Sequence, residues 1–198
     1  CGRVVTASLT SQSPDITCAG QKTFTFTYTD CAGKTQPWIY TYTIGDPVWT
    51  APDAGSSTVA CPANATLPVP PVVTDNCGRT VPAALTSQSP DITCTGQKTF
   101  TFTYTDCAGK TQPWVYTYTI SDPVWTAPAA GSSTVACPSG ISQPVPPVVT
   151  DNCGRAVTAA LTSQSPDITC AGQKTFTFTY TDCAGKTQTW IYTFTILP

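Results

Sequence analysis

Cysteine and aspartate are the residues of this chain whose side chains are best suited to specific chemistry. The 198 residues include 11 cysteines and 11 acidic residues, all of them aspartate, and no histidine. Without histidine there is no Ser–His or Cys–His pair to activate a nucleophile. Without histidine or glutamate, the common zinc and glycosidase constellations reduce to cysteine and aspartate alone. We therefore predict that the protein is not an enzyme and needs no catalytic cofactor.

The low charge of the chain narrows the choice of partners. Charged residues make up 10% of the sequence and the net charge is −2. This charge is too low and of the wrong sign to follow a phosphate backbone, which argues against nucleic-acid binding. No apolar run approaches the length of a membrane span, so we expect no span in this segment.

The cysteines are too numerous for a reducing compartment unless they bind metal. They lack the C-x-x-C spacing of zinc ribbons. Disulfides in an extracellular, oxidising setting are therefore the better interpretation.

The positions of the cysteines belong to a tandem repeat. "CGR" recurs with a period of 76 residues, and 64 of residues 1–76 are identical in residues 77–152. The 16-residue stretch "QKTFTFTYTDCAGKTQ" occurs unchanged at 21–36, 97–112 and 173–188. Such uniformity indicates an array built by duplication, with one small β-domain in each repeat.

The segment "DPVWTAPDAGSS" at 46–57 has the composition of a linker. We therefore predict three domains: repeat 1 at residues 1–46, repeat 2 at 47–121 and repeat 3 at 122–198. On this division repeat 1 is a partial domain without its first strands, and we expect a longer chain or a neighbouring molecule to complete it.

Strict alternation predicts the strands that position these residues. In "KTFTFTYT" Phe24, Phe26 and Tyr28 share one face and threonines the other, which is the period of a half-buried strand. "QPWIYTYTI" at 36–44 continues this pattern after a "DCAGK" turn at 30–34, so the two form a hairpin with an aromatic inner face.

Shorter strands are predicted at "SSTVAC" (56–61) and "PVPPVVT" (68–74), and two more within 79–93. No segment has helical periodicity with caps. The predicted fold class is all-β: tandem immunoglobulin-like β-sandwich domains, stabilised by disulfides, with a 76-residue repeat.

The long strand limits which cysteines can pair within a domain. Cys94 precedes this strand and Cys107 follows it, so they lie too far apart to bond to each other in one domain. We expect "TDNC" and "TDC" to lie at the same pole. This favours the pairs Cys1–Cys31, Cys61–Cys94, Cys77–Cys107, Cys137–Cys170 and Cys153–Cys183.

This scheme leaves Cys18 waiting for a partner outside the sequence. The alternative joins Cys61 to Cys107 and Cys77 to Cys94, and leaves Cys31 alone instead.

Several motifs resemble a known family. The "CP" at 61–62 and 137–138, "DNCG" at 75–78 and 151–154, and "TDCAGK" at 29–34, 105–110 and 181–186 resemble HYR-like, immunoglobulin-like repeats of giant bacterial surface proteins. These include Bacteroidota adhesins of the gliding-motility type. Lys34, Lys110 and Lys186 depart from this pattern, since the family usually has asparagine there. The resemblance implies secretion, a tandem-domain stalk or filament, and adhesion at a tip.

Aspartates at the ends of neighbouring domains suggest a possible calcium site. Carboxylates that converge at a junction can bind Ca²⁺, although the dense acidic loop of familiar calcium sites is missing. Turn capping through backbone N–H groups is the alternative role. The candidate ligands are Asp46, Asp75, Asp106, Asp122, Asp151 and Asp182.

Two further surfaces are candidates for contacts. Trp49 and Trp125, in "DPVWTAP", are predicted to pack into the junctions between domains, with a sugar platform as the alternative. A threonine face could instead hold glycan or ice, or could simply keep an exposed sheet soluble. Its residues are Thr23, Thr25, Thr27, Thr29, Thr41 and Thr43.

These observations favour a structural role. We expect an extracellular, cell-surface stalk or filament segment that presents an adhesin, with further copies of the same repeat, in the same chain or in neighbouring subunits, as partners. The alternative is a glycan- or ice-binding module that uses the threonine-rich sheet face.

Overall fold

The computed structural model describes residues 2–198, and these residues form two compact units. Of the described residues, unit 1 comprises 2–55, 68–88 and 100–116, and unit 2 comprises 56–67, 89–99 and 117–198. Unit 1 thus holds repeat 1 with one part of repeat 2, and unit 2 holds the other part of repeat 2 with repeat 3. The predicted domain boundaries stay a prediction.

Residues 2–198 contain strands and two short 3₁₀ turns but no α-helix, which confirms the predicted all-β class. In repeat 1 the strands are β1 (Ala7–Gln12), β2 (Gly20–Thr29) and β3 (Thr35–Ile44). Repeat 2 has β4 (Gly55–Val59), η1 (Pro62–Asn64), β5 (Val73–Thr74), β6 (Thr80–Val81), β7 (Ala83–Gln88), β8 (Gly96–Thr105) and β9 (Thr111–Ile120). Repeat 3 has β10 (Gly131–Val135), η2 (Pro138–Gly140), β11 (Val149–Thr150), β12 (Ala156–Gln164), β13 (Gly172–Thr181) and β14 (Thr187–Ile196).

The predicted hairpin is confirmed in each repeat. In repeat 3 β13 and β14 pair antiparallel from Gly172↔Ile196 to Thr181↔Thr187. The equivalent β2 and β3 share this register, and Gly33 adopts a φ of 77° in the turn between them. A positive φ is readily accessible only to glycine, which explains the residue at this position of the turn.

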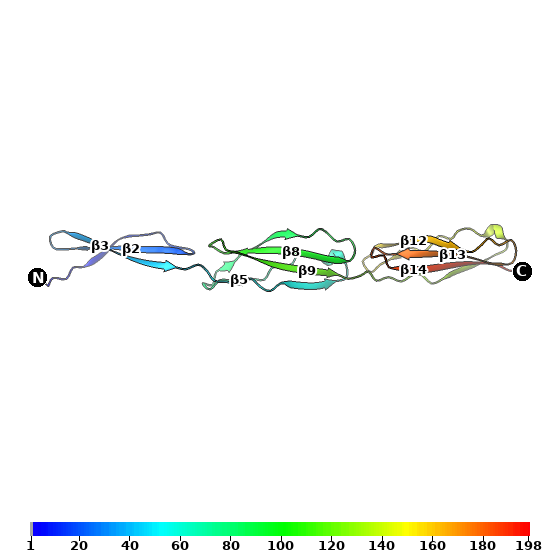
Figure 1. The fold of residues 1–198 in the computed structure, drawn as a ribbon, viewed down its shortest axis with the longest axis horizontal. Coiled ribbons are helices and arrows are strands. Elements are labelled where there is room, and N and C mark those ends of the chain that lie inside the picture. Colours follow the sequence, from blue (N-terminus) through cyan, green and yellow to red (C-terminus); the bar gives the residue numbers. More distant parts are fainter. Residues whose placement is uncertain (1) are drawn as a thin grey trace. The chain divides into compact units, whose positions relative to one another are not determined.

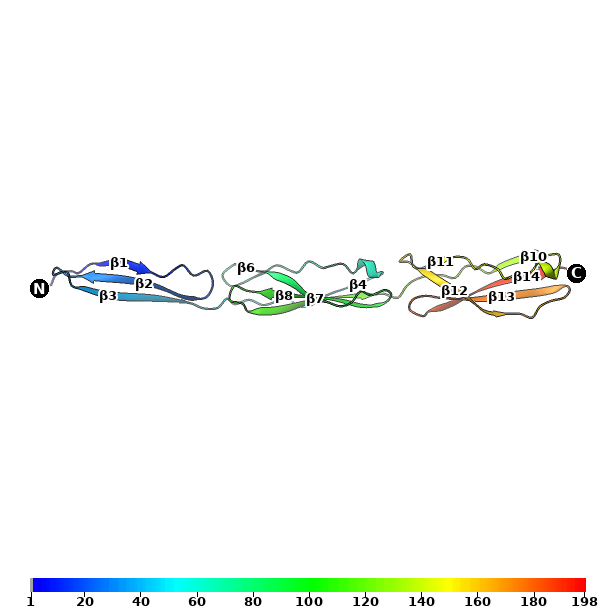
Figure 2. The same cartoon turned by 90° about the horizontal axis from the view of Figure 1, so that it is seen from above.

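The hairpin forms the centre of a larger sheet (Figure 1). In repeat 3 the strand order is β10-β14-β13-β12-β11, and β10 runs parallel to β14. Repeat 2 has the order β4-β9-β8-β7, with a separate two-stranded β5-β6 sheet. In repeat 1 the sheet has three strands, with β1 and β3 on either side of β2 (Figure 2).

The alternation of the sequence correctly predicted the inner face of the sheet. In repeat 3 the buried cluster contains Phe176, Phe178, Tyr180 and Trp190 from the hairpin. The segment 125–149 supplies the opposite layer, through Trp125, Ile141 and Val149, so the core lies between a sheet and an irregular layer.

The proline-rich segment forms less strand than the sequence predicted. Only Val73–Thr74 of the predicted strand 68–74 pairs, because Pro68, Pro70 and Pro71 have no N–H to donate to a ladder. The segment instead contributes a carbonyl: Pro71 O accepts a hydrogen bond of 2.5 Å from the hydroxyl of buried Tyr104.

Candidate functional site: the disulfide-linked junctions

In the loop "DNCGR" at 151–155, most side chains make a hydrogen bond or a disulfide to a different partner. Asp151 Oδ1 accepts hydrogen bonds from the backbone N–H groups of Cys153 (2.8 Å) and Arg155 (3.0 Å). Asp151 Oδ2 accepts a bond of 2.8 Å from Arg155 Nε. Asn152 holds the linker, since its Oδ1 accepts from the Val124 N–H and its own N–H donates to Val124 O. The loop therefore fixes both the position of Cys153 and the entry of the chain into repeat 3.

The loop "TDCAGK" at 181–186 is organised by Asp182 in the same way. Its Oδ1 accepts from the backbone N–H groups of Ala184 (2.9 Å) and Lys186 (2.8 Å). Its Oδ2 accepts from the indole Nε1–H of Trp125 at 2.7 Å. The carboxylate thus ties the linker tryptophan to the turn that carries Cys183.

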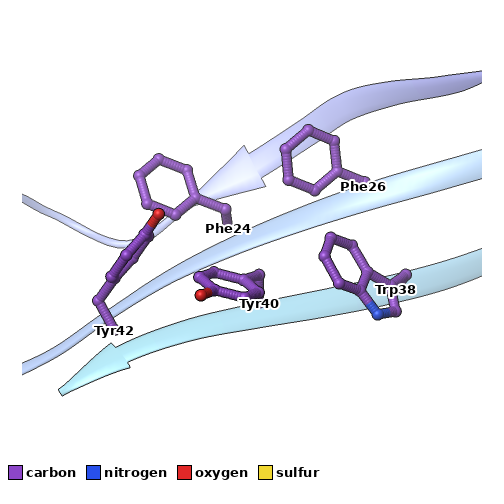
Figure 3. A pocket seen from close by; sticks show the side chains of 5 residues that line it. All are labelled: Phe24, Phe26, Trp38, Tyr40 and Tyr42. Atoms are coloured by element: carbon purple, nitrogen blue, oxygen red, sulfur yellow. The ribbon is translucent and has the colours of Figure 1, made fainter.

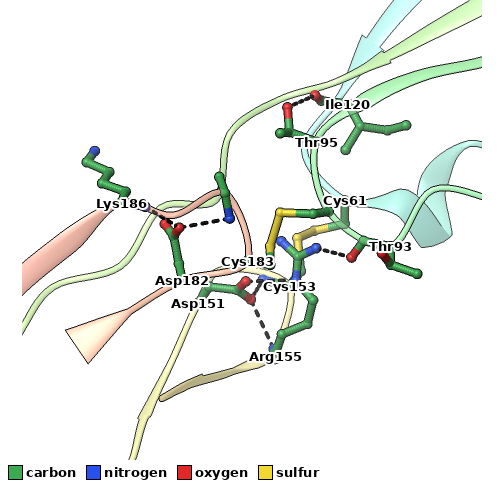
Figure 4. Close-up of a disulfide and its surroundings, with 12 residues drawn as sticks. Cys61, Thr93, Thr95, Ile120, Asp151, Cys153, Arg155, Asp182, Cys183 and Lys186 are labelled. Carbon is green, nitrogen blue, oxygen red and sulfur yellow. Dashed lines mark hydrogen bonds and ion pairs between the residues drawn. A yellow bond between two sulfur atoms is a disulfide. The ribbon is translucent and has the colours of Figure 1, made fainter. Parts of the chain in front are cut away.

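Two disulfides in unit 2 join these loops to the preceding repeat (Figure 4). Cys153 bonds to Cys61 with 5.6 Å between the Cα atoms, and Cys183 bonds to Cys94 with 5.8 Å. Between them, Arg155 Nη1 donates a hydrogen bond of 2.6 Å to Thr93 O, beside Cys94. Repeat 3 is therefore tied to repeat 2 by two covalent bonds and one charged hydrogen bond.

Unit 1 repeats part of this arrangement. Cys18 of repeat 1 bonds to Cys107 of repeat 2, with 5.7 Å between the Cα atoms. Arg79 Nη1 donates a hydrogen bond of 2.5 Å to Thr17 O, and Arg79 Nε bonds to Asp75 at 2.8 Å. Cys77, which corresponds to Cys153, is a free and exposed thiol.

Four of the five predicted disulfide pairs are wrong. "TDNC" and "TDC" do lie at one pole, as expected, because Asp75, Arg79, Asp106 and Cys107 line one pocket. Each loop bonds to the preceding repeat, however, and not to the other loop. The predicted Cys61–Cys94, Cys77–Cys107, Cys137–Cys170 and Cys153–Cys183 pairs, and the alternative Cys61–Cys107 and Cys77–Cys94 pairs, are replaced by Cys18–Cys107, Cys61–Cys153 and Cys94–Cys183.

Four other cysteines among residues 2–198 carry free thiols. Cys31, Cys77, Cys137 and Cys170 are unpaired and exposed. The predicted partner of Cys31 was Cys1, which lies outside the described residues. Cys18, expected to lack a partner, is bonded.

The buried carboxylates of these loops are held in their ionised form. Burial works to raise the pKa of Asp182, but the hydrogen bonds from Trp125, Lys186 and Ala184 outweigh it, so the pKa is lowered. Asp151 follows the same pattern, with Arg155 supplying the strongest opposing bonds. The pKa of Asp75 is lowered chiefly by its bond from the Arg79 backbone N–H. These carboxylates act as acceptors that fix the loops.

Calcium binding at the predicted residues stays a prediction, and the geometry does not favour it. Asp75, Asp106, Asp151 and Asp182 are buried and already accept N–H donors. Asp46 and Asp122 are exposed. Within residues 2–198, no three potential metal ligands of the types His, Cys, Asp or Glu come together.

The linker tryptophans pack differently from the prediction. Trp125 belongs to the core cluster of its own repeat, with its ring 6.3 Å from that of Tyr180. Trp49 likewise lies 6.2 Å from Tyr104 and donates to Asp106 at 2.7 Å. Each tryptophan anchors the linker to the domain that follows it, because its indole N–H donates to a carboxylate of that domain.

The threonine face is satisfied largely by its own cross-strand contacts. Thr10 Oγ1 lies 2.9 Å from Thr27 Oγ1, and Thr162 Oγ1 lies 3.0 Å from Thr179 Oγ1. Opposite Thr25 and Thr27 stand Ile39 and Pro37, so the hydroxyl array of Thr23, Thr25, Thr27, Thr29, Thr41 and Thr43 is interrupted. A glycan or ice ligand on this face stays a prediction.

Two arginines and three lysines were missed by sequence reasoning. Arg79 and Arg155 reach across a junction, and the recurring "DNCGR" loop was the available sign. Lys98 and Lys174 are buried and bond to Asp91 and Asp167 at 2.9 Å, as Lys22 bonds to Asp15 at 2.8 Å.

The inner face of repeat 1 is exposed, in contrast to that of repeat 3. Its aromatic side chains line an open pocket of about 380 Å³ (Figure 3). Trp38 and Tyr42 are 50% and 54% exposed, whereas the equivalent Trp190 and Phe194 are 4% and 9% exposed. The lining residues are Phe24, Phe26, Trp38, Tyr40 and Tyr42.

The four-cysteine pattern of each full repeat identifies the family. The family model described as "HYR-like domain with 4 cysteines" matches residues 1–44, 49–120 and 125–196. The chain belongs to this HYR-like family. The predicted HYR-like resemblance is therefore confirmed.

Two curated relatives carry the name hyalin. The chain is 28% identical to hyalin of Strongylocentrotus purpuratus over 90% of its length, and 27% identical to hyalin of Lytechinus variegatus over 93%. It spans only 16% and 38% of the length of those proteins. These relatives lend no support to the bacterial gliding-motility type of HYR-like protein, which stays a prediction.

Among solved structures, the chain is similar to protocadherin gamma B7 extracellular domains 1–4. The identity is 10%, the TM-score is 0.38, and the match covers 98% of this chain and 66% of that one. No helix in residues 2–198 is long and apolar enough to cross a membrane. The family match and the disulfides show tandem, disulfide-bonded HYR-like repeats.

Proposed function

We propose that this chain is a tension-bearing segment of an extracellular stalk or filament that presents an adhesin. Hyalin-type relatives, the tandem repeats and the disulfides support an extracellular adhesive setting. A bacterial cell surface remains part of this proposal only through the motif resemblance. The role is geometric and mechanical, and no catalytic step is needed.

The observation that carries the proposal is the path of the covalent bonds. Cys94 and Cys107 stand at the two ends of β8, and each bonds to a different neighbouring repeat. Tension entering through Cys18 passes to Cys107, along β8 to Cys94, and on to Cys183. Because β8 is already extended, the bonds can carry force without any domain unfolding.

This path makes the oxidised chain almost inextensible. The shortest covalent route has 17 residue steps from Cys1 to Cys18, 13 from Cys107 to Cys94 and 15 from Cys183 to Pro198. At a maximum of roughly 3.5 Å per residue, these 45 steps reach roughly 160 Å, against roughly 690 Å for the reduced chain. The disulfides thus shield most of the sequence from stretching.

Force spectroscopy of the chain held at its two ends tests the proposal. The oxidised protein should rupture or resist at a contour length near roughly 160 Å, without the sawtooth peaks of domain unfolding. After reduction, unfolding steps should appear and the contour length should increase about fourfold. Unfolding steps of whole repeats in the fully oxidised chain would contradict the proposal.

The threonine face is the alternative basis for function, as a glycan- or ice-binding surface. It is supported only by the exposed cross-strand threonine pairs. A glycan array and a thermal-hysteresis assay with no signal would remove this alternative.

A further inference from the structure

Repeats 2 and 3 differ most in one loop. Residues 49–120 and 125–196 differ at 12 positions, and five of these are consecutive. They form the variable segment, which reads "ANATL" at 63–67 and "SGISQ" at 139–143. The segment begins within the 3₁₀ turn η1 in repeat 2 and within η2 in repeat 3.

In both repeats the variable segment lines a pocket together with residues that do not vary. Both pockets lie within unit 2, and their volumes are about 310 Å³ in repeat 2 and about 430 Å³ in repeat 3. These volumes are in the range of small-molecule sites, roughly 300–1,000 Å³. The invariant lining residues are Asp91, Ile92 and Lys98 in repeat 2, and Asp167, Ile168 and Lys174 in repeat 3.

The lysine of the pocket is buried and its charge is already balanced. The ammonium of Lys174 donates hydrogen bonds to Ser165 O and to Asp167 Oδ1, the second at 2.9 Å. Its Nζ also lies 5.4 Å from the centre of the Phe176 ring. A covered ammonium offers little to an anion, and a single carboxylate that already accepts from an ammonium is a poor cation site. The pocket therefore suits a neutral ligand.

The variable segment determines how polar the pocket is. In repeat 3 it contributes Ser142 and Gln143, which are exposed, and the exposed Gln164 of β12 lines the same pocket. In repeat 2 the segment contributes Ala63 and Ala65 instead. Only the pocket of repeat 3 thus combines a hydroxyl and two amides, which can both donate and accept hydrogen bonds.

A following repeat leaves this pocket open. In repeat 2 the cysteines next to the pocket, Cys61 and Cys94, are bonded to repeat 3. The side chain of Asp91 is nevertheless 96% exposed, the same fraction as that of Asp167. Access to the pocket is therefore compatible with a continuous array of repeats.

We propose that the pocket of repeat 3 binds a neutral sugar residue, and that residues 139–143 give this repeat a specificity that repeat 2 lacks. The sugar hydroxyls bond to Ser142, Gln143 and Gln164, and the oxygen of Asp167 that does not bond to lysine accepts one more hydroxyl. The apolar C–H face of the sugar ring packs on Ile141 and Ile168.

The test uses the full oxidised chain, isotope-labelled for NMR, and four separate probes: glucose, galactose, mannose and N-acetylglucosamine. Changes in amide chemical shift during each titration give both the affinity and the location of the sugar. We expect at least one of these sugars to cause saturable shifts in residues 139–143 and 164–174, and no such shifts in the equivalent residues of repeat 2.

Exchange of the variable segments provides matched variants, because each segment already occurs in this fold. The first variant should weaken sugar binding roughly tenfold or more, through the loss of hydrogen bonds to the ligand. The reverse exchange, which places "SGISQ" at 63–67, should create a second site with saturable shifts in repeat 2. The first variant carries Ser139→Ala, Gly140→Asn, Ile141→Ala, Ser142→Thr and Gln143→Leu.

A pair of aspartate variants separates binding from folding. Asp167→Asn and Asp91→Asn each remove the carboxylate partner of a buried lysine, so their cost in stability should be equal. Only Asp167→Asn should weaken sugar binding, by roughly tenfold.

Three results would overturn the proposal. The first is the absence of saturable shifts with all four sugars. The second is binding that survives the first exchange, which would place the sugar elsewhere, such as on the threonine face. The third is an equal loss of binding with Asp91→Asn. The titration involves no force, so the sugar site and the proposed stalk can each fail alone.

Discussion

Removal of one junction disulfide should lower the free energy of unfolding of repeat 3, by an amount that can be worked out from the entropy of loop closure. When repeat 2 is folded and repeat 3 is unfolded, the Cys61–Cys153 bond closes a loop of roughly 31 residues, from residue 122 to Cys153. The loop-closure relation gives about 3.7 kcal/mol at 25 °C for such a loop. Because Cys94–Cys183 remains and already restricts the same chain, the net loss is about 3 kcal/mol.

The variant carries Cys61→Ser together with Cys153→Ser, and calorimetry under non-reducing conditions measures its melting. About 3 kcal/mol corresponds to a decrease of roughly 12–25 °C for a domain of this size. Cys137→Ser is the matched control, since Cys137 is the equivalent of Cys61 in the next repeat and is exposed and unpaired. It should leave the melting temperature within about 1 °C, because surface substitutions without such contacts cost little.

Alkylation of a single variant separates this pairing from one inside each repeat. With Cys153→Ser, bonding between repeats releases the thiol of Cys61, whereas bonding within repeat 3 would release Cys183. Mass spectrometry after alkylation without reduction identifies which thiol is modified in addition to Cys31, Cys77, Cys137 and Cys170, which are free in the parent chain as well. A modified Cys183, or a double variant that melts like the parent chain, would refute the reasoning.

Four further perturbations follow from the contacts. Trp125→Phe removes the donor to buried Asp182 and should cost roughly 1–3 kcal/mol in urea denaturation, with no loss if the bond is absent in solution. The pKa of Asp182 is lowered below its ordinary 3.8, so its stabilisation is present above that pH and is lost as the pH falls through the folded value. Circular dichroism should therefore give a flat melting temperature from about pH 7 to 5 and a decline below about pH 4. Gly131→Ala should destabilise by roughly 1–3 kcal/mol because its Cβ meets the Tyr192 ring, whereas Gly45→Ala, with open space around it, serves as the neutral control. Calcium or EDTA should leave the melting temperature unchanged, since the buried carboxylates already hold N–H donors, and a rise with calcium would contradict this.

The strands and their buried faces could be predicted because aromatic and threonine residues alternate along them, and in a strand every second side chain points to the same face. Phe176, Phe178 and Tyr180 are buried where period 2 placed them. The proline-rich segment was harder to predict, because "PVPPVVT" has strand-forming valines but too few N–H groups to pair. Trp125 was predicted to lie at a junction because the tryptophan recurs in each linker segment "DPVWTAP". Its hydrogen-bond partner Asp182 lies 57 residues away in the sequence. Only the folded chain shows that contact.

The disulfides could not be predicted because the cysteines recur at the same position in every repeat, so the sequence does not show whether a cysteine bonds within its own repeat or to the next one. The observed bonds join a cysteine of one repeat to a cysteine of the next. Cys94 bonds to Cys183, which is the equivalent of Cys107 one period later, and Cys61 bonds to Cys153, which is the equivalent of Cys77. The strand length correctly excluded Cys94–Cys107, since those residues lie at opposite poles of one domain. A residue at the far pole of one repeat nevertheless faces the near pole of the next. Cys94 therefore cannot bond to Cys107 of its own domain but can bond to the equivalent Cys183 of the next repeat. Cysteines that are too far apart to pair within a domain can in this way link successive repeats covalently.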